Sequence, residues 1–325
     1  MKIAVTGGSG FVGKHLVEKL VSEGHEIKVF VRKTSNNKLL EKLDVELVYG
    51  DLLDKKSIES LVKDVDVVYH LAAKVYAGSR DEFWNVNLKG TENMLGACLN
   101  TALNRFVHVS TVGVTGSIET PPGDESNPYN ATSPYDQSKR ESEKIALQYH
   151  REHEMPVTIV RAPMLYGPRY MGLEKFYEAI QSGSYRLIGS MTNFMHPCYI
   201  ENFLQGLTLA GEQRKAIGEV YIIADEKPIT WVEYVSMTAE ALGVKPPNKH
   251  VSKSMMKFIA SLSEFKSWMF GGEPIVRRGW IDELTKNFAY DITKARKDLG
   301  YSPEFSTKEG VTRTIDWYRK NSLLK

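Results

Sequence analysis

Short runs of apolar, largely β-branched residues alternate with longer amphipathic stretches from residue 2 to about residue 161. This alternation is typical of a parallel sheet covered by helices on both faces. We predict strands at residues 2–6, 26–31, 45–50, 66–71, 105–110 and 157–162. The connection after the first strand predicts a helix from residue 11 that stops at Gly24. The pattern therefore favours an α/β fold with a doubly wound parallel sheet.

The alternation breaks down after Pro163, where glycine, proline and aromatic residues become frequent. The remaining chain predicts a strand at residues 219–224, a helix at 231–243 and a last amphipathic helix at 307–320. We therefore divide the chain into a first domain at residues 1–162 and a smaller, mixed α/β C-terminal region at 163–325. Some chain is expected to return from the second part to the first. Because no low-complexity linker separates the two, we expect them to share an interface.

Composition places the chain among ordinary globular proteins, with 42% hydrophobic and 25% charged residues. Its net charge of +2 gives no broad field for nucleic acid or an anionic membrane, so an anion site would have to be local. Cys98 and Cys198 stand far apart among apolar neighbours, as buried thiols in a reducing compartment do. Without a signal peptide or an apolar run of about 18 residues, the chain is expected to be cytoplasmic, with no integral membrane segment.

The segment TGGSGFVG follows the first predicted strand and opens the first helix. Backbone N–H groups at a helix N-terminus can hold a pyrophosphate where glycine keeps side chains out of the way. The glycines fit both the GxxGxxG and the GxGxxG spacing, so the pattern alone does not choose between dehydrogenase superfamilies. It predicts a Rossmann-type, NAD(P)-binding domain at residues 1–162. The predicted phosphate-binding residues are Gly7, Gly10, Phe11, Val12 and Gly13.

Arg32 and Lys33 stand at the end of the second strand, where NAD-binding chains usually carry an acidic residue. A guanidinium there can bind a 2′-phosphate and stack on adenine, whereas a carboxylate would repel the phosphate. NADP(H) is therefore favoured as the cofactor, and NAD(H) remains possible. The alternative is that both residues are ordinary solvated cations at a strand end.

The segment YDQSK places Tyr135 and Lys139 one turn apart on a predicted helix. A neighbouring ammonium stabilises a phenolate, which lets Tyr135 exchange a proton with a hydroxyl or carbonyl oxygen. About 24 residues upstream, a strand delivers Ser110 and Thr111 to the edge of the sheet where ligands bind. Thr111 could donate a hydrogen bond to the substrate oxygen. Neither pattern is specific alone, but together they predict the catalytic residues Thr111, Tyr135 and Lys139.

With these motifs the chain resembles the extended short-chain dehydrogenase/reductases, also called the NAD-dependent epimerase/dehydratase family. The resemblance extends over GDL at 50–52, HLAA at 70–73, NVNLKGT at 85–91, RAPMLYGP at 161–168 and CYIENF at 198–203. It implies the same roles for the three catalytic residues, and homodimerisation through helices at about 82–103 and 135–153. It further implies contacts with the adenine, the middle and the nicotinamide end of the cofactor. These contacts would come, in that order, from Asp51 and Leu52, from Leu71, Ala72 and Ala73, and from Pro163 and Met164.

Departures from the family pattern narrow the expected chemistry. Val112 and Gly113 follow Thr111 where sugar-nucleotide dehydratases usually carry an acidic pair. Thr115 and Met195 stand where sugar-nucleotide epimerases tend to have a tyrosine and a diphosphate-binding arginine. The C-terminal segment instead resembles the 3β-hydroxysteroid dehydrogenase branch, and VFVRKTS resembles dihydroflavonol reductase-like members. This favours interconversion of a ketone and an alcohol on a largely apolar small molecule.

Two other functions stay open. An NDP-sugar 4-epimerase with tightly bound NAD is the first, and measured redox turnover would separate it from a reductase. A cofactor-sensing regulator that uses the fold only for binding is the second, and it would be expected to lack the catalytic triplet.

A Met- and Phe-rich segment at residues 254–272 suits a lid over an apolar substrate or a membrane-contact surface, but a helix packing its apolar stripe into the core is favoured. His70 is expected to be structural, whereas His196 has no partner at ligand spacing, so no metal is proposed. Arg169 is expected to bind either an anionic substrate group or a carboxylate. The two histidines of HREHE at 150–154 suit a solvated helix end.

Overall fold

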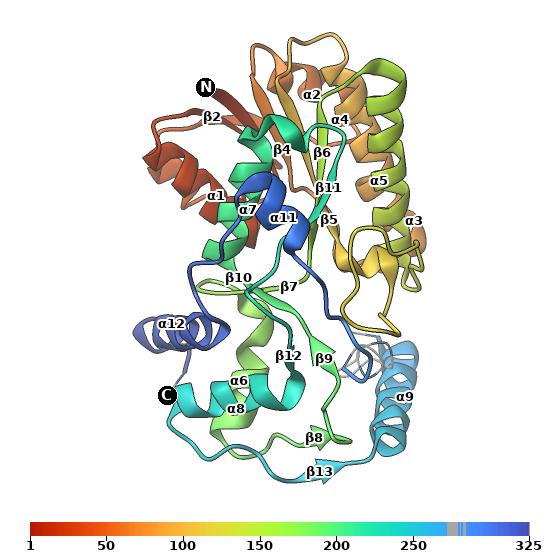
Figure 1. Ribbon diagram of the computed structural model, residues 1–325, viewed down its shortest axis with the longest axis vertical. Coiled ribbons are helices and arrows are strands. Elements are labelled where there is room, and N and C mark those ends of the chain that lie inside the picture. Colours follow the sequence, from red (N-terminus) through yellow and green to blue (C-terminus); the bar gives the residue numbers. More distant parts are fainter. Residues whose placement is uncertain (272–278, 280, 282–283, 325) are drawn as a thin grey trace.

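The computed structural model describes residues 1–271, 279, 281 and 284–324. Its centre is a seven-stranded parallel sheet of order β11-β6-β5-β4-β1-β2-β3 (Figure 1). The strands are β1 (Lys2–Thr6), β2 (Glu26–Val31), β3 (Glu46–Tyr49), β4 (Val67–His70), β5 (Arg105–Thr111), β6 (Val157–Ala162) and β11 (Val220–Ile222). This confirms the predicted α/β, doubly wound architecture, and the six predicted N-terminal strands agree with the observed ones to within one residue at each end.

Helices cover both faces of this sheet. One face carries α1 (Phe11–Ser22), α7 (Ile200–Glu212) and α11 (Thr293–Leu299). The other carries α2 (Lys55–Val62), α4 (Gly90–Cys98) and α5 (Pro134–His153). Helix α3 (Arg80–Phe83) and a π-helix (Trp84–Lys89) lead into α4. Short 3-10 turns stand at Leu40–Lys42, Val112–Thr115, Met171–Leu173 and Arg214–Ala216.

The strand predicted at residues 219–224 joins the main sheet, because β11 pairs with β6 at its edge. Together with α7 and α11, it packs on the strands formed by the first 162 residues. The boundary at residue 162 itself stays a prediction.

The C-terminal part is built from helices and three two-stranded sheets (Figure 1). Its helices are α6 (Glu174–Gln181), α8 (Trp231–Leu242), α9 (Lys253–Phe270) and α12 (Thr307–Lys320). The strand pairs are β7 (Met164–Tyr166) with β10 (Pro197–Tyr199), β9 (Phe194–Met195) with β12 (Ile229–Thr230), and β8 (Leu187–Ile188) with β13 (His250–Val251). Capping boxes at Thr230 and Ser306 fix where α8 and α12 begin, close to the predicted positions.

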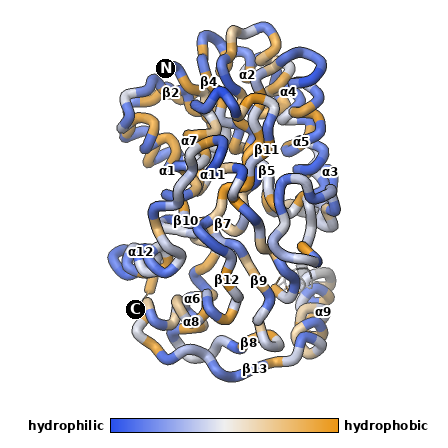
Figure 2. Tube along the Cα trace, in the orientation of Figure 1, coloured by the Kyte–Doolittle hydropathy of each residue, from blue (hydrophilic) through white to orange (hydrophobic). Residues whose placement is uncertain are grey.

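One hydrophobic core joins the two parts of the chain. It extends from Ile3 in β1 through Val160 in β6 and Tyr199 in β10 to Tyr318 in α12. A second cluster lies between the sheet and the helices α2, α4 and α5. Around both clusters the helices alternate between hydrophilic and hydrophobic residues (Figure 2). The predicted shared interface is therefore present.

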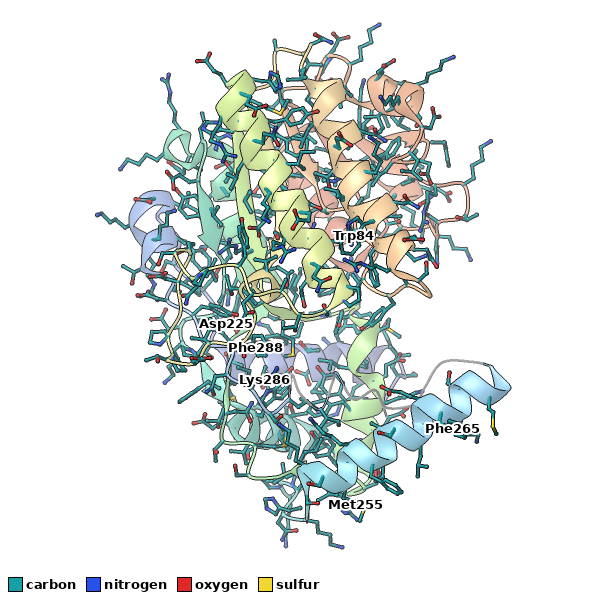
Figure 3. All side chains as sticks on the ribbon, turned by 90° about the vertical axis from the view of Figure 1, so that its right-hand side faces the viewer. Trp84, Asp225, Met255, Phe265, Lys286 and Phe288 are labelled. Carbon is teal, nitrogen blue, oxygen red and sulfur yellow. The ribbon has the colours of Figure 1, made fainter. Side chains whose placement is uncertain are left out.

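Asp225 is a buried carboxylate just after β11 that ties the C-terminal helix to the sheet (Figure 3). Its Oδ1 accepts hydrogen bonds from the Tyr199 backbone N–H at 2.9 Å and from Asn202 Nδ2 at 2.7 Å. Its Oδ2 accepts from Tyr166 OH at 3.1 Å and from Thr307 Oγ1 at 3.0 Å. Burial raises the pKa of Asp225, and these four donors stabilise its charged form. The Asp225 side chain thus holds together segments that lie far apart in the sequence.

The favoured interpretation of residues 254–272, a helix that packs its apolar stripe into the core, is wrong. Residues 254–270 do lie in the helix α9, and residue 272 is outside the described residues. However, six large apolar side chains of α9 are exposed to between 41% and 61% of their surface. They are Met255, Phe258, Ile259, Leu262, Phe265 and Met269. Among the described residues, no helix has both the length and the apolar character needed to cross a bilayer.

Candidate active site

The loop between β1 and α1 forms a tight cradle of bare backbone. Gly7 has a φ of +72°, and its carbonyl accepts a hydrogen bond from the Gly10 N–H at 2.9 Å. A Cβ on Gly7 would lie 2.8 Å from the Ala72 backbone nitrogen, and one on Gly13 would lie 2.2 Å from the Gly7 carbonyl oxygen. The first N–H groups of α1, at Phe11, Val12 and Gly13, have no partner within the helix. Because any side chain on these glycines would fill the cradle, the bare loop leaves its N–H groups accessible to a pyrophosphate.

The other predicted cofactor residues follow the carboxyl ends of neighbouring strands. Arg32 and Lys33 are exposed directly after β2, and neither forms an ion pair within the described residues. After β3, Asp51 is exposed and Leu52 is buried against Gly90. Leu71, Ala72 and Ala73 follow β4, and Pro163 and Met164 follow β6, all partly exposed. The structure therefore brings these residues to one edge of the sheet.

Thr111 and Tyr135 are brought together by a close contact between the end of β5 and the start of α5. Thr111 is partly exposed, and its Oγ1 accepts a hydrogen bond from the Gly113 N–H at 3.1 Å. Gly113 packs on Asp136, since a Cβ there would lie 2.0 Å from Asp136 Oδ1. Ser110 differs from Thr111, because it is only 3% exposed and cannot reach a substrate. The turn after Thr111 thus lies against the first turn of α5, which carries Tyr135.

Lys139 lies one turn beyond Tyr135 and is only 2% exposed. Its ammonium donates to the Val109 carbonyl at 2.8 Å and lies 3.4 Å from His108 Nε2. Burial lowers the pKa of Lys139 to about 8, against the opposing effect of the Glu143 carboxylate. Burial and the Asp136 carboxylate raise the pKa of Tyr135. The structure therefore places a buried cation one helical turn from Tyr135, with its hydrogen bond and its contact directed to β5.

Sequence reasoning missed two residues that hold this arrangement. His108 is fully buried, stacks on His70 with ring centroids 5.6 Å apart, and has a pKa lowered by burial and by Lys139. Asn87 joins the loop after β4 to α5: its Oδ1 accepts from the Lys74 N–H at 2.7 Å, and its Nδ2 donates to Ser138 Oγ at 2.9 Å. The motif NVNLKGT contains Asn87, but no sequence signal marks His108.

Several other polar residues singled out in the sequence have structural partners. His70 contacts Thr6 Oγ1 at 2.8 Å and Thr91 Oγ1 at 3.0 Å, as expected of a structural histidine. His196 donates from Nε2 to the Asp225 carbonyl at 2.8 Å. Arg169 pairs with Glu18 at 2.7 Å. The described part of the chain contains no His, Cys, Asp and Glu cluster able to hold a metal.

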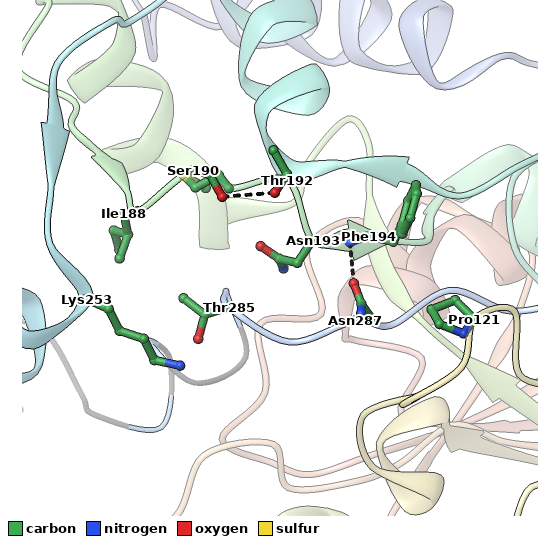
Figure 4. Close-up of a pocket in the computed structure, with 11 residues that line it drawn as sticks. Pro121, Ile188, Ser190, Thr192, Asn193, Phe194, Lys253, Thr285 and Asn287 are labelled. Carbon is green, nitrogen blue, oxygen red and sulfur yellow. Dashed lines mark hydrogen bonds between the residues drawn. The ribbon is translucent and has the colours of Figure 1, made fainter.

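A pocket of about 560 Å³ lies between the loop after β8 and the segment after residue 284 (Figure 4). Pro121, from the loop that connects Thr111 to α5, forms part of its wall. Ile188, Met191 and Phe194 supply apolar surface, and of the described lining residues only Lys253 is charged. The pocket therefore offers a small molecule more apolar and neutral polar surface than charge.

Comparisons with known proteins agree with this geometry. Residues 3–224 match the sequence pattern of the "NAD dependent epimerase/dehydratase family". The chain is 30% identical to a 3-beta-hydroxysteroid dehydrogenase of Mycolicibacterium neoaurum, over 98% of this chain and 91% of that protein. It is 31% identical to a 2-alkyl-3-oxoalkanoate reductase of Stenotrophomonas maltophilia, over 96% and 98%. It also superposes on UDP-glucuronic acid 4-epimerase from Bacillus cereus in complex with NAD, with a TM-score of 0.79, 25% identity and 99% coverage of both chains. Because these relatives perform different reactions, their names leave the reaction open.

Proposed function

Because this chain belongs to the NAD dependent epimerase/dehydratase family of enzymes, we propose that it interconverts a ketone and a secondary alcohol on a largely apolar small molecule. The observation that carries this proposal is the apolar surroundings of Tyr135. The Phe83 ring lies 6.2 Å from the Tyr135 ring, and the nearby Tyr76 side chain is 61% exposed. A steroid-like or alkyl ketone would cover the exposed Tyr76 ring, whereas a sugar would leave it in contact with water.

Three side chains share the proposed chemistry. The cofactor, when bound, supplies or accepts the hydride at the carbon that carries the oxygen. In the direction of reduction, Tyr135 gives its phenolic proton to the carbonyl oxygen, and Thr111 donates a hydrogen bond that holds this oxygen in place. The Lys139 ammonium stabilises the phenolate that remains. In the direction of oxidation, Tyr135 takes the proton back.

Two features support a reductase over the sugar-nucleotide enzymes of the family. Met195, at the position where the resemblance would place a diphosphate-binding arginine, is buried and pairs with Ile229 in a short sheet. Gly113 leaves no space for an acidic side chain, because Asp136 already occupies it. An NDP-sugar 4-epimerase with tightly bound NAD is the second candidate, favoured by the structural similarity to UDP-glucuronic acid 4-epimerase.

Redox turnover separates these candidates. We expect the purified protein to oxidise added NADPH in the presence of hydroxysteroid-related or long-chain ketones, followed by absorbance at 340 nm. An epimerase would instead interconvert UDP-sugars with no net change in free cofactor. Binding of NADPH with neither reaction would favour the cofactor-sensing regulator.

Arg32 is proposed to select NADP(H) by binding its 2′-phosphate. Replacing Arg32 with Gln is expected to raise the KM for NADPH roughly 10- to 100-fold and to change the KM for NADH much less, because one charge-assisted contact is lost. The exposed Arg151, at the far end of α5, provides the control variant Arg151→Gln. Equal effects of Arg32→Gln on both cofactors would contradict the proposed selectivity.

The buried Lys139 predicts a loss of reductase activity at alkaline pH. Its pKa of about 8 means that the ammonium is present below this pH and is lost above it. Without the ammonium the phenolate of Tyr135 is less stable, so we expect kcat for ketone reduction to fall above about pH 8, by up to about tenfold per pH unit. A profile of kcat between neutral and alkaline pH measures this, and a flat profile would contradict the role of Lys139.

We further propose that the protein is a cytoplasmic homodimer. The buried, unpaired thiols of Cys98 and Cys198 fit a reducing compartment. The dimer would form through α4 and α5, which lie side by side on one face of the sheet. Sedimentation equilibrium would measure its mass.

A further inference from the structure

Helix α9 is amphipathic, but its apolar side chains face outward and its polar side chains face the protein. Six large side chains form what we call the outer face of α9, and each is at least 41% exposed. They are Met255, Phe258, Ile259, Leu262, Phe265 and Met269. The opposite side of α9 faces the protein with mostly polar residues, including Lys257, Ser261, Ser263, Glu264 and Ser267, all partly buried. A helix of a water-exposed protein normally has the reverse arrangement.

The attachment of α9 to the protein uses little apolar surface. Ala260 is fully buried and belongs to a small cluster with Ile188 and Ile281, to which Met256 and Leu284 add partly buried side chains. Figure 3 shows α9 extending along the outside of the C-terminal part, with Met255 and Phe265 labelled on it. Contiguous exposed apolar side chains of this kind mark an interaction surface.

Lysine is frequent in the segment that leads into and forms this helix. Residues 244–270 contain five lysines and a single acidic residue, Glu264, so this stretch carries a net charge of +4. Two of these lysines precede α9, so the helix Lys253–Phe270 itself, with three lysines and Glu264, carries a net charge of +2. Lys266 is exposed within the angular range of the outer face, where its stem can lie along the apolar surface and its ammonium can reach outward.

We propose that the outer face of α9 docks onto the surface of an anionic lipid membrane. The apolar side chains would enter the boundary between head groups and acyl chains, with the helix axis in the plane of the membrane, and Lys266 would lie near lipid phosphates. A second copy of this chain would also cover the apolar side chains. However, it would bring two helices of net charge +2 together, which an anionic surface does not. The charge therefore favours lipid.

Docking would also bring the pocket of Figure 4 near the membrane. Lys253, the first residue of α9, lines that pocket, so the pocket lies beside the start of the docked helix (Figure 4). An apolar molecule dissolved in the membrane would then be close to the pocket. The docking proposal itself does not depend on the proposed reaction, since lipid binding and turnover are measured separately.

Vesicle binding tests the proposal. We expect the full-length protein to co-sediment with vesicles of phosphatidylcholine containing phosphatidylglycerol, and to bind vesicles of phosphatidylcholine alone much less. Binding to the anionic vesicles should weaken as the salt concentration rises. The double variant Phe258→Ser/Leu262→Ser is expected to lower the partition coefficient at least about 10-fold, because two side chains no longer enter the membrane. Lys266→Glu should weaken binding to the anionic vesicles.

A matched control is available at Leu53, outside α9 and outside the helices of the proposed dimer. Leu53 is 50% exposed, so Leu53→Ser should bind vesicles as the unaltered protein does. Thermal unfolding should show that all variants are folded, since exposed substitutions change the free energy of unfolding by only about 0.5 kcal/mol. The proposal is overturned if anionic vesicles do not bind the protein, or if Phe258→Ser/Leu262→Ser binds them unchanged. It is also overturned if the double variant abolishes a dimer of a protein that ignores lipid, which would identify a second copy as the occupant.

Discussion

Replacing Tyr135 with Phe is expected to lower kcat for ketone reduction about 10²- to 10⁴-fold, because the proton donor to the carbonyl oxygen is removed. The KM for NADPH should change little, since the ring remains and only the hydroxyl is lost. The protein should also stay folded, because no hydrogen bond from the Tyr135 hydroxyl supports the described part of the structure. Steady-state kinetics with NADPH and a ketone, together with circular dichroism, would measure these quantities.

The same helix offers a control for this substitution. Tyr149 lies near the other end of α5, where its ring packs on His153 at 5.3 Å between centroids. Tyr149→Phe should therefore have normal kinetics. If Tyr135→Phe retained the turnover of the unaltered protein, the proposed acid and base role would be wrong, whichever substrate was used.

Replacing Gly13 with Ala is expected to weaken NADPH binding at least about 100-fold, which corresponds to roughly 2.7 kcal/mol. The added Cβ would lie 2.2 Å from the Gly7 carbonyl oxygen and 2.5 Å from the Gly8 Cα. Both contacts are with backbone, so no side chain can rotate away and the phosphate cradle must move. Overpacking of this kind should also destabilise the fold by about 1–3 kcal/mol. Fluorescence titration with NADPH measures the first effect and urea unfolding the second.

Gly96 in α4 provides the comparison for Gly13. A Cβ there would meet only the Tyr149 hydroxyl, at an ordinary 3.7 Å. Gly96→Ala should therefore bind NADPH normally and be as stable as the unaltered protein or more so, because alanine favours the helix. Normal NADPH affinity in Gly13→Ala would show that the loop between β1 and α1 is not the phosphate site.

The sheet could be predicted because its strands are buried on both faces and appear as short, continuous apolar runs. However, an apolar run does not indicate which other strand it pairs with. Val220–Ile222 was recognised as a strand, but only the structure shows its pairing with β6 in the main sheet. Helix α9 shows a related limit. Its sequence reveals one apolar face, but whether that face packs inward depends on the partners that the fold supplies.

In the proposed site, too, some features could be predicted from the sequence and others could not. The glycine loop and the Tyr135 and Lys139 pair are local patterns, so the sequence was sufficient to predict them. The contact of Lys139 with His108 joins a helix to a strand 31 residues away, and the packing of Gly113 on Asp136 closes the 22-residue connection between β5 and α5. Contacts of this kind depend on how the elements are positioned in three dimensions, which spacing does not encode.

The hydrogen bonds of Asp225 have a consequence for the cooperativity of unfolding. One of the four donors to this carboxylate is the hydroxyl of Thr307, and Asn202, another donor, is itself held by the Phe305 backbone. Thr307 lies 82 residues beyond Asp225, and Phe305 lies 103 residues beyond Asn202. These bonds therefore exist only when the start of α12 is docked against β11 and α7, so the C-terminal part and the parallel sheet should lose their structure in one transition.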